Sequence, residues 1–300
     1  MQPLINDRED LIELVRGVKV IYTDLDGTML GRGGTLLVDG TGNPSTRTAE
    51  AVVALTRVGI PIVPVTGRSD FQLVEIVRMC GLDDFIGESG AVLSWWTGSE
   101  RKERYILPKW DDEILSDRMP IQVMKDMGAA ELLFNAFPGQ LEHHTPWDSP
   151  RKASELLRGR LDLGEAQALL DTLPISVDIT ENSVITPKRH TLAEPTSPDN
   201  AQIHAYHIVP AGVSKANAIA EDLKRRGVDP QHALMIGDGM SDLLCARSVG
   251  VAIVVENGQR SRNLMNSIAD CPNAVFIRGE KGDGWVNMAN LILEGTTTTV

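Results

Sequence analysis

The feature that most constrains the fold is an alternation of short β-rich runs with amphipathic helical patterns, which occurs twice along the 300 residues. The first stretch predicts strand, helix, strand and helix, at residues 18–23, 43–58, 60–65 and 70–80. The second predicts helix, strand, helix and strand, at residues 214–226, 233–236, from 242, and 251–255. Such alternation is typical of an α/β fold with a doubly wound, mainly parallel sheet of the Rossmann type.

The stretch between these two regions has a different texture. Charges cluster there, prolines stand at joints such as residues 144–147, and a hairpin is expected around residues 175–185. We therefore predict two domains: a core built from residues 1–93 and 208–300, and an inserted α+β domain at residues 94–207.

Composition and charge limit the partners. The 29 basic residues against 41 acidic ones give a net charge of −12, which argues against DNA or RNA as a partner, because these need a basic face. Three scattered cysteines, Cys80, Cys245 and Cys271, are too few for a disulfide framework or a zinc site. The first ten residues lack the pattern of a signal peptide, and no run approaches the ~20 apolar residues of a membrane span. We expect a cytoplasmic protein with no nucleic-acid or membrane partner.

Two carboxylates follow the first expected strand. Asp24 and Asp26 are separated by one residue and lead into a Gly-Thr turn at residues 27–28. Side chains two apart on an extended backbone project to the same side, so both carboxylates can face one reacting group. This arrangement suits a nucleophile with an acid/base partner.

A second acidic cluster follows a later strand. Asp238 and Asp242 lie in the Gly/Asp-rich loop that begins after residues 233–236. Parallel sheets gather the carboxyl ends of their strands at one crevice, and Mg²⁺ prefers hard oxygen ligands such as carboxylates. The sequence therefore indicates a magnesium site at this edge of the sheet.

Groups suited to a phosphate lie at the same edge. Thr66 directly follows the expected strand at residues 60–65, and the amide of Gly67 is free to approach a phosphate oxygen. Lys215 stands in the first turn of an expected helix, where an ammonium opposes the helix dipole, so a functional need explains it better than helix propensity. A lone Lys at such a position is more often a solvated surface residue.

Taken in order, Asp24 to Thr28, Thr66, Lys215 and the loop 237–242 resemble the four motifs of the haloacid dehalogenase-like hydrolase superfamily. Within it the chain is most similar to the Cof-like sugar-phosphate phosphatases, a subgroup that includes sucrose-phosphate phosphatases. The resemblance implies that residues 94–207 form a cap that selects the substrate. It also implies a magnesium-dependent phosphatase acting on a small phosphorylated metabolite, such as a sugar or polyol phosphate or a phosphoglycerate-type anion.

The resemblance also implies the chemistry. Asp24 would attack phosphorus while Asp26 protonates the leaving alcohol, and Asp26 would then activate the water that hydrolyses the aspartyl phosphate. Mg²⁺ would be held by the Asp24 carboxylate, the Asp26 backbone carbonyl and Asp238, with Asp242 as a ligand or its partner. The phosphoryl oxygens would be bound by Thr66, Gly67, Lys215 and Gly27.

Two positions depart from the family pattern. Ser241 stands where relatives commonly carry Asn, which leaves the hydrogen bond expected there open. Glu88 and Ser89, followed by glycine, stand where many relatives have an Asn-Gly pair, which would alter the floor of the site and leave the chemistry unchanged.

Alternatives remain open at this stage. A phosphosugar mutase uses the same residues and scaffold, whereas a phospho-acceptor signalling domain is disfavoured by Asp26, which would speed loss of the phosphoryl group.

The cap contains three basic pairs that could bind a second anion or simply be solvated: Arg101-Lys102, Arg151-Lys152 and Lys188-Arg189. We interpret the histidines at 143, 144, 204 and 207 as structural or surface residues, and we expect a monomer or weak homodimer.

Overall fold

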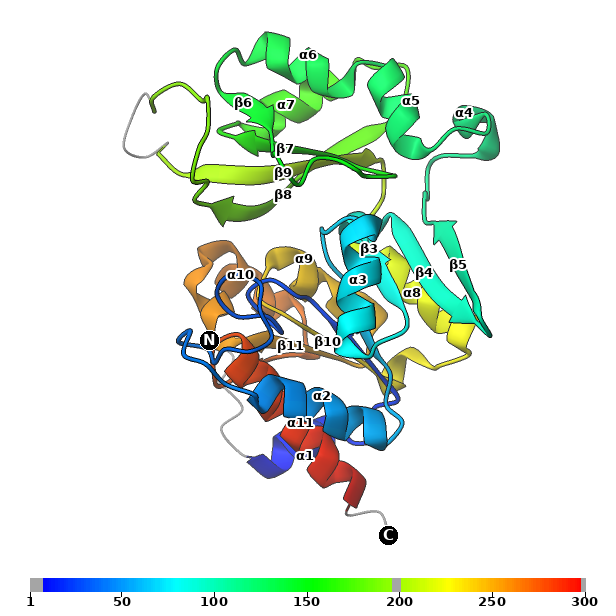
Figure 1. Ribbon diagram of the computed structural model, residues 1–300, viewed down its shortest axis with the longest axis vertical. Coiled ribbons are helices and arrows are strands. Elements are labelled where there is room, and N and C mark those ends of the chain that lie inside the picture. Colours follow the sequence, from blue (N-terminus) through cyan, green and yellow to red (C-terminus); the bar gives the residue numbers. More distant parts are fainter. Residues whose placement is uncertain (1–7, 196–200, 298–300) are drawn as a thin grey trace.

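A five-stranded parallel sheet forms the centre of the larger part of the molecule (Figure 1). The computed structural model describes residues 8–195 and 201–297. The sheet has the order β12-β11-β10-β1-β2, and each neighbouring pair is parallel. Its strands are β1 Val20–Thr23, β2 Ile62–Pro64, β10 Ala233–Gly237, β11 Val251–Val255 and β12 Ala274–Ile277. This confirms the α/β class inferred from the alternating pattern.

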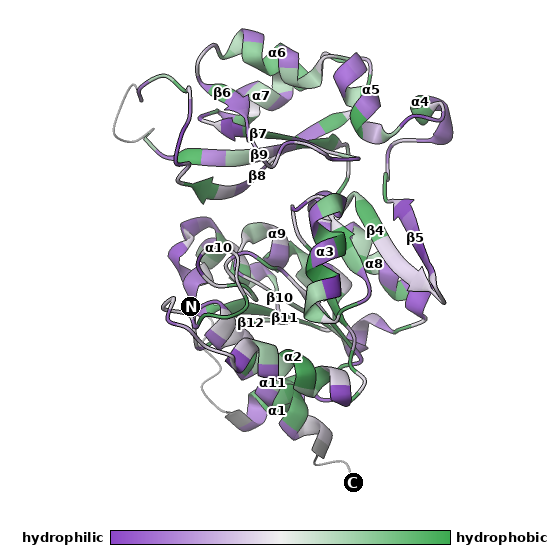
Figure 2. Cartoon of the chain, in the orientation of Figure 1, coloured by the Kyte–Doolittle hydropathy of each residue, from purple (hydrophilic) through white to green (hydrophobic). Residues whose placement is uncertain are grey.

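Helices cover both faces of this sheet. One face carries α1 (Arg8–Val15), α2 (Arg47–Arg57) and α11 (Gly282–Thr297), and the other carries α8 (Lys215–Arg226), α9 (Met240–Leu243) and α10 (Arg262–Ser267). Because side chains alternate along a strand, Ile21 packs against the first group of helices and Tyr22 against the second. The strands are accordingly hydrophobic along their length (Figure 2), as strands buried on both faces must be.

Beyond β2 the chain adds a helix and a small antiparallel sheet. The helix α3 (Asp70–Cys80) begins where the Ser69 amide donates to Gln72 Oε1, and it ends at Gly81 in the left-handed conformation. The sheet has the order β3-β4-β5, with β3 Phe85–Gly87, β4 Val92–Thr97 and β5 Glu100–Tyr105.

A four-stranded antiparallel sheet forms the second part of the molecule, above the first in Figure 1. Its order is β6-β7-β9-β8, with β6 Leu141–His143, β7 Glu155–Gly159, β9 Ile203–Pro210 and β8 Val177–Ile185. The helices on its outer side are α4 Asp112–Leu115, α5 Pro120–Asp126, α6 Ala129–Ala136 and α7 Leu163–Leu170. Leu133, Leu157 and Ile208 join these helices and strands in one core. The division of the chain at residues 94 and 207 stays a prediction.

The prediction of a hairpin around residues 175–185 is wrong. Residues 177–185 form the single strand β8, which pairs antiparallel with β9. The pattern was misleading because polar residues interrupt β8 at a bulge, where the register shifts between Glu181 and Ser183.

In the ranges 8–195 and 201–297, no helix combines the length and hydrophobicity needed to cross a bilayer.

Candidate active site

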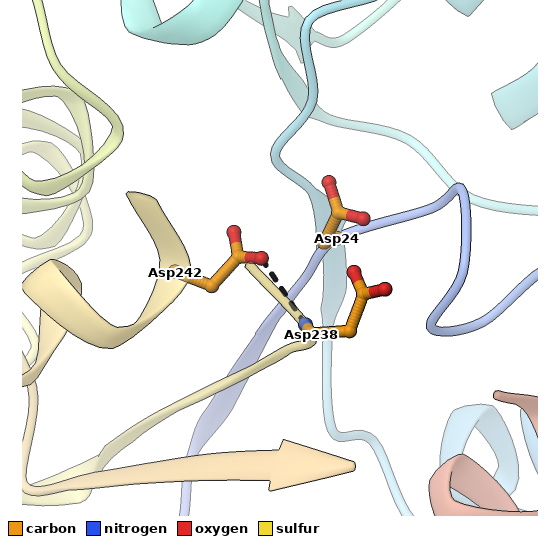
Figure 3. Close-up of side chains that lie close together, drawn as sticks. All are labelled: Asp24, Asp238 and Asp242. Atoms are coloured by element: carbon orange, nitrogen blue, oxygen red, sulfur yellow. Dashed lines mark hydrogen bonds between the residues drawn. The ribbon is translucent and has the colours of Figure 1, made fainter. Parts of the chain in front are cut away.

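Three carboxylates meet at the carboxyl edge of the parallel sheet. Asp24 follows β1 and Asp238 follows β10, and these strands are direct neighbours in the sheet. Asp24, Asp238 and Asp242 each present one oxygen, and these oxygens lie within 4.8 Å of one another (Figure 3). The predicted convergence of two distant acidic motifs is therefore present in the fold.

The loop after β10 is closed by its own aspartate. Asp242 Oδ2 accepts hydrogen bonds from the amides of Asp238, at 3.2 Å, and Gly239, at 3.0 Å. These bonds cap the start of α9 and fix the Asp242 side chain. The other oxygen of Asp242 is left to face Lys215.

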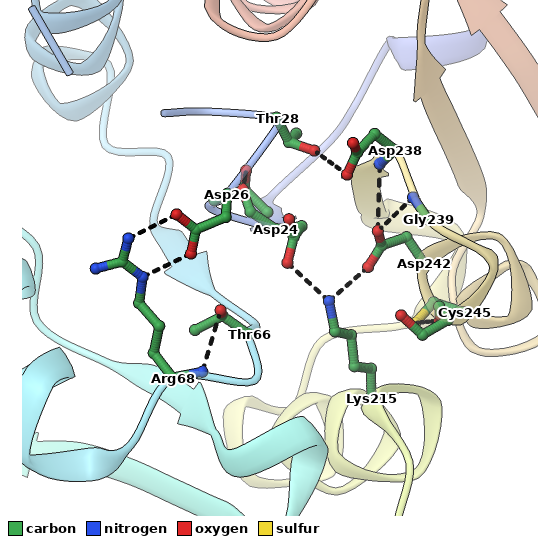
Figure 4. Close-up of polar contacts among 12 residues, drawn as sticks. Asp24, Asp26, Thr28, Thr66, Arg68, Lys215, Asp238, Gly239, Asp242 and Cys245 are labelled. Atoms are coloured by element: carbon green, nitrogen blue, oxygen red, sulfur yellow. Dashed lines mark hydrogen bonds and ion pairs between the residues drawn. The ribbon is translucent and has the colours of Figure 1, made fainter. Parts of the chain in front are cut away.

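Lys215 joins the acidic groups (Figure 4). Ser214 caps α8 by accepting the amide of Asn217, which places Lys215 as the first residue of the helix. The buried Lys215 Nζ donates to Asp24 Oδ1 and to Asp242 Oδ1, each at 2.7 Å. Although burial alone would lower the pKa of Lys215, these two carboxylates raise it.

One ammonium does not balance three carboxylates. Burial raises the pKa of Asp24 well above its ordinary range, and Asp242 and Asp238 raise it further against the opposing effect of Lys215. Burial and Asp242 likewise raise the pKa of Asp238 to about 6. The cluster therefore has a deficit of positive charge, and its donors are hard oxygens. Both properties fit a divalent cation such as Mg²⁺.

The loop after Asp24 holds Asp238 in place. Thr28 Oγ1 donates to Asp238 Oδ1 at 3.3 Å, and Asn257 Nδ2 bonds both Asp238 Oδ2, at 2.9 Å, and the Gly27 carbonyl, at 3.0 Å. Gly27 has a φ of +87°, and a Cβ built on it would lie 2.5 Å from Asp238 Oδ2. Only glycine fits this close approach.

Asp26 lies outside the acidic cluster. Its carboxylate accepts two hydrogen bonds of 2.6 Å from Arg68, one from Nε and one from Nη2, and its side chain is 53% exposed. Figure 4 shows this pair on the side of Asp24 opposite Lys215. Thr66 is buried beneath it, with its hydroxyl accepting the Arg68 amide at 3.3 Å.

Residues that the sequence did not single out also shape the site. Arg68 and Asn257 bind expected site residues directly, and Arg68 was recognisable only as the neighbour of Thr66 and Gly67. Glu88, which the sequence did single out as a departure from the family pattern, is fully buried, and its carboxylate accepts the amides of Lys152 and Ala153 and the hydroxyl of Ser154. Glu88 therefore links the floor of the site to the second part of the molecule.

The sequence left open the role of Ser241 and of the basic pairs. Ser241 is exposed, and its carbonyl accepts the Cys245 thiol at 3.3 Å. Among the basic pairs, Arg101 and Lys152 form ion pairs with Asp70, whereas Lys188 and Arg189 are exposed.

The sequence model of the haloacid dehalogenase-like hydrolases matches residues 175–269 of this chain. A phosphoglycolate phosphatase of Archaeoglobus fulgidus is 24% identical over 261 residues, which cover 85% of this chain and 92% of that protein. A phosphoglycolate phosphatase of Methanoculleus marisnigri is 23% identical over 80% of this chain and 85% of its own length.

The fold is also similar to that of solved structures. The sucrose-phosphatase of Synechocystis, solved with sucrose and phosphate, has a TM-score of 0.59 at 15% identity, covering 94% of this chain and 98% of that one. A sugar phosphatase of haloacid dehalogenase subclass IIB has a TM-score of 0.53 at 15% identity, covering 94% and 98%. The sequence match confirms the resemblance to the haloacid dehalogenase-like hydrolases that the four motifs indicated, and the solved structures confirm the fold.

Proposed function

We propose that this chain, a phosphatase of the haloacid dehalogenase-like hydrolases, uses Mg²⁺ to hydrolyse phosphate monoesters of small metabolites through a phosphorylated aspartate. The observation that carries the proposal is the meeting of Asp24, Asp238 and Asp242 around Lys215. Nucleophile, cation ligands and charge-balancing ammonium are then within reach of one phosphoryl group.

In this proposal Asp24, Asp238 and the backbone carbonyl of Asp26 hold Mg²⁺, with Asp242 as a further ligand or its support. The clustering of the three carboxylates, and the raised pKa values of Asp24 and Asp238, favour such an ion. When bound, Mg²⁺ would neutralise charge on the phosphoryl oxygens and on the acidic cluster.

The covalent step uses the chain's own side chains. A carboxylate oxygen of Asp24 forms a bond to phosphorus as the bond from phosphorus to the leaving oxygen breaks, and Asp26 gives its proton to that oxygen. In the second step Asp26 takes a proton from water, whose oxygen displaces the Asp24 carboxylate from phosphorus. Thr66, Gly67, Gly27 and Lys215 would hold the phosphoryl oxygens through both steps.

Arg68 adds a condition to this scheme. Because both oxygens of Asp26 are bonded to Arg68, the carboxylate must leave that pair before it exchanges a proton with substrate. We propose that substrate entry opens the pair, and that residues 94–207, as the cap, then close over the site and exclude water.

The substrate class is a sugar or polyol phosphate, or an anion of the phosphoglycerate type. The relatives support this range, since they include phosphoglycolate phosphatases and a phosphatase solved with sucrose. A cytoplasmic monomer or weak homodimer is part of the same proposal.

The test is a phosphate-release screen over sugar, polyol and glycerate phosphates, with Mg²⁺ or with a chelator. Magnesium-dependent release supports the proposal, and release that the chelator leaves unchanged contradicts it. A second arm adds a bisphosphate activator: isomerised sugar phosphate in place of free phosphate would assign a phosphosugar mutase instead.

A further inference from the structure

His207 of β9 lies against the proposed phosphate-binding loop although it belongs to the second part of the molecule. A Cβ built on Gly67 would stand 2.8 Å from His207 Nε2, which shows how closely the ring approaches that backbone. The side chain is only 1% exposed, and its Nδ1 has no hydrogen-bond partner among the described residues. A buried polar atom without a partner is costly. Because Nε2 is the ring nitrogen that faces Gly67, a ligand at this edge of the site would be contacted through Nε2.

Asn182 of β8 lies beside His207. The same Cβ would stand 3.2 Å from Asn182 Nδ2 and 3.3 Å from its Oδ1. Asn182 is the extra residue at the bulge, where pairing moves from Glu181 with Tyr206 to Ser183 with Ala205. Bulges redirect side chains, and here the bulge brings an exposed amide to the same point as the histidine.

The segment after residue 150 holds this part of the second sheet in place. Arg151 Nη2 donates to the Gly67 carbonyl at 2.6 Å, and Glu88 accepts the two backbone amides and the hydroxyl of the next three residues. The placement of His207 over Gly67 is thus tied to the core by buried hydrogen bonds.

His207 offers a ligand no positive charge, and the cation beside it, Arg151, is already bonded. Burial, followed by Arg151, holds the pKa of His207 well below its usual range, so the ring stays neutral and offers one donor and one acceptor. Arg151 cannot easily serve a carboxylate, because it already donates to the carbonyls of Gly67 and Trp147 and to Ser154 Oγ. A hydroxyl also donates and accepts, and therefore matches both the imidazole and the amide of Asn182.

Resting on the proposed function, we infer that His207 and Asn182 contact the leaving group beside the phosphate ester, and that this group is an uncharged hydroxyl-bearing sugar or polyol rather than a carboxylate. Both residues then determine specificity for the alcohol and take no part in phosphoryl transfer itself.

The test compares kcat/KM for three kinds of substrate: a panel of sugar and polyol phosphates, phosphoglycolate, and p-nitrophenyl phosphate, whose leaving group has neither hydroxyl nor carboxylate. For the wild type we expect the best sugar or polyol phosphate to exceed phosphoglycolate by more than about tenfold. His207→Leu should lower kcat/KM for that substrate by about tenfold to a hundredfold and for p-nitrophenyl phosphate by less than about threefold.

Further variants guard against a merely structural effect. His207→Gln keeps a donor and an acceptor and should recover most of the sugar-phosphate activity, whereas Asn182→Ala, at an exposed position, should lower it by about fivefold. His204→Leu is the matched control, because His204 lies on the same strand but bonds Glu181, and it should change none of the three values.

The outcomes separate this inference from the proposed function. A wild type that prefers phosphoglycolate, or Asn182→Ala and His207→Gln variants that lower activity equally on all three substrates, would overturn the inference and leave the phosphatase intact. A wild type that releases phosphate from none of them would overturn both.

Discussion

Lys215 Nζ donates a 2.7 Å hydrogen bond to Asp24 Oδ1, joining residues that lie 191 positions apart in the chain. The same ammonium bonds Asp242 at 2.7 Å, so one cation serves two buried carboxylates. Removing one partner of such a group leaves uncompensated charge in a poorly solvated place. The contact therefore links the stability of the site to its proposed chemistry.

Lys215→Met should remove both functions of the ammonium. We expect phosphate release to fall by at least about a hundredfold, because a positive group beside the transferring phosphoryl is lost. The metal-free protein should also lose about 3 kcal/mol of unfolding free energy. Lys224→Met, an exposed position on the same helix, is the control and should match wild type in kinetics and denaturation. Wild-type turnover in Lys215→Met would contradict the assignment.

Asp26 and Arg68 should behave as a coupled pair. Asp26→Asn removes the proposed acid/base group and should lower kcat by about a hundredfold to a thousandfold. Adding Arg68→Met to that variant should change kcat little further, because the partner of Arg68 is already lost. The same change in Arg78, which forms an exposed pair with Glu75, provides the control. If the fall in kcat of the double variant equals the product of the separate falls in Asp26→Asn and Arg68→Met, the two residues are not coupled.

Gly27→Ala tests how tightly the acidic cluster is packed. The added methyl would overlap the Asp238 carboxylate and would sit on a backbone with φ of +87°, so we expect Mg²⁺ affinity to fall by more than about tenfold. Gly59 has a similar φ of +76°, but a Cβ added there would meet no atom within 4 Å. Gly59→Ala is therefore the control that shows the effect of backbone strain without the overlap. Calorimetric titration with Mg²⁺ should therefore separate the two variants; equal affinities would contradict the packing.

Asp238 should make the metal-free protein sensitive to pH. Its pKa is raised from 3.8 to about 6. Protonated Asp238 therefore makes its full contribution to the free energy of unfolding below about pH 4, and this contribution is lost as the pH rises through 6. The proposed Mg²⁺ would bind the ionised form and should offset this loss above about pH 6. Asp238→Asn should then raise the melting temperature of chelator-treated protein near pH 7 and abolish the Mg²⁺-induced rise, whereas Asp83→Asn, on the surface, should do neither. A Mg²⁺-induced rise that persists in Asp238→Asn would exclude this ligand.

Much of the fold could be predicted because its signals are local. The β-rich runs 18–23 and 233–236 end at acidic loops, and both become neighbouring strands of the parallel sheet. The shared edge of that sheet then brings Asp24 near Asp238, as the rule for parallel strands requires.

What could not be predicted depends on contacts between distant segments. β8 pairs with β9 across a loop that carries no pairing signal, so its length and bulge were missed. The bonds of Arg68 to Asp26 and of Glu88 to residues 152–154 depend on side-chain placement after folding. His207 gains its position over Gly67 only once the two parts of the molecule meet.

The most direct test of the central claim is magnesium-dependent phosphate release by Asp24→Asn beside wild type and the surface control Asp83→Asn. The variant keeps the size of the side chain, so it should unfold like wild type or be somewhat more stable, since one of three crowded carboxylates is gone. We expect its turnover to fall by more than about ten-thousandfold, while Asp83→Asn retains full activity. Turnover in Asp24→Asn within about tenfold of wild type would show that another group attacks phosphorus.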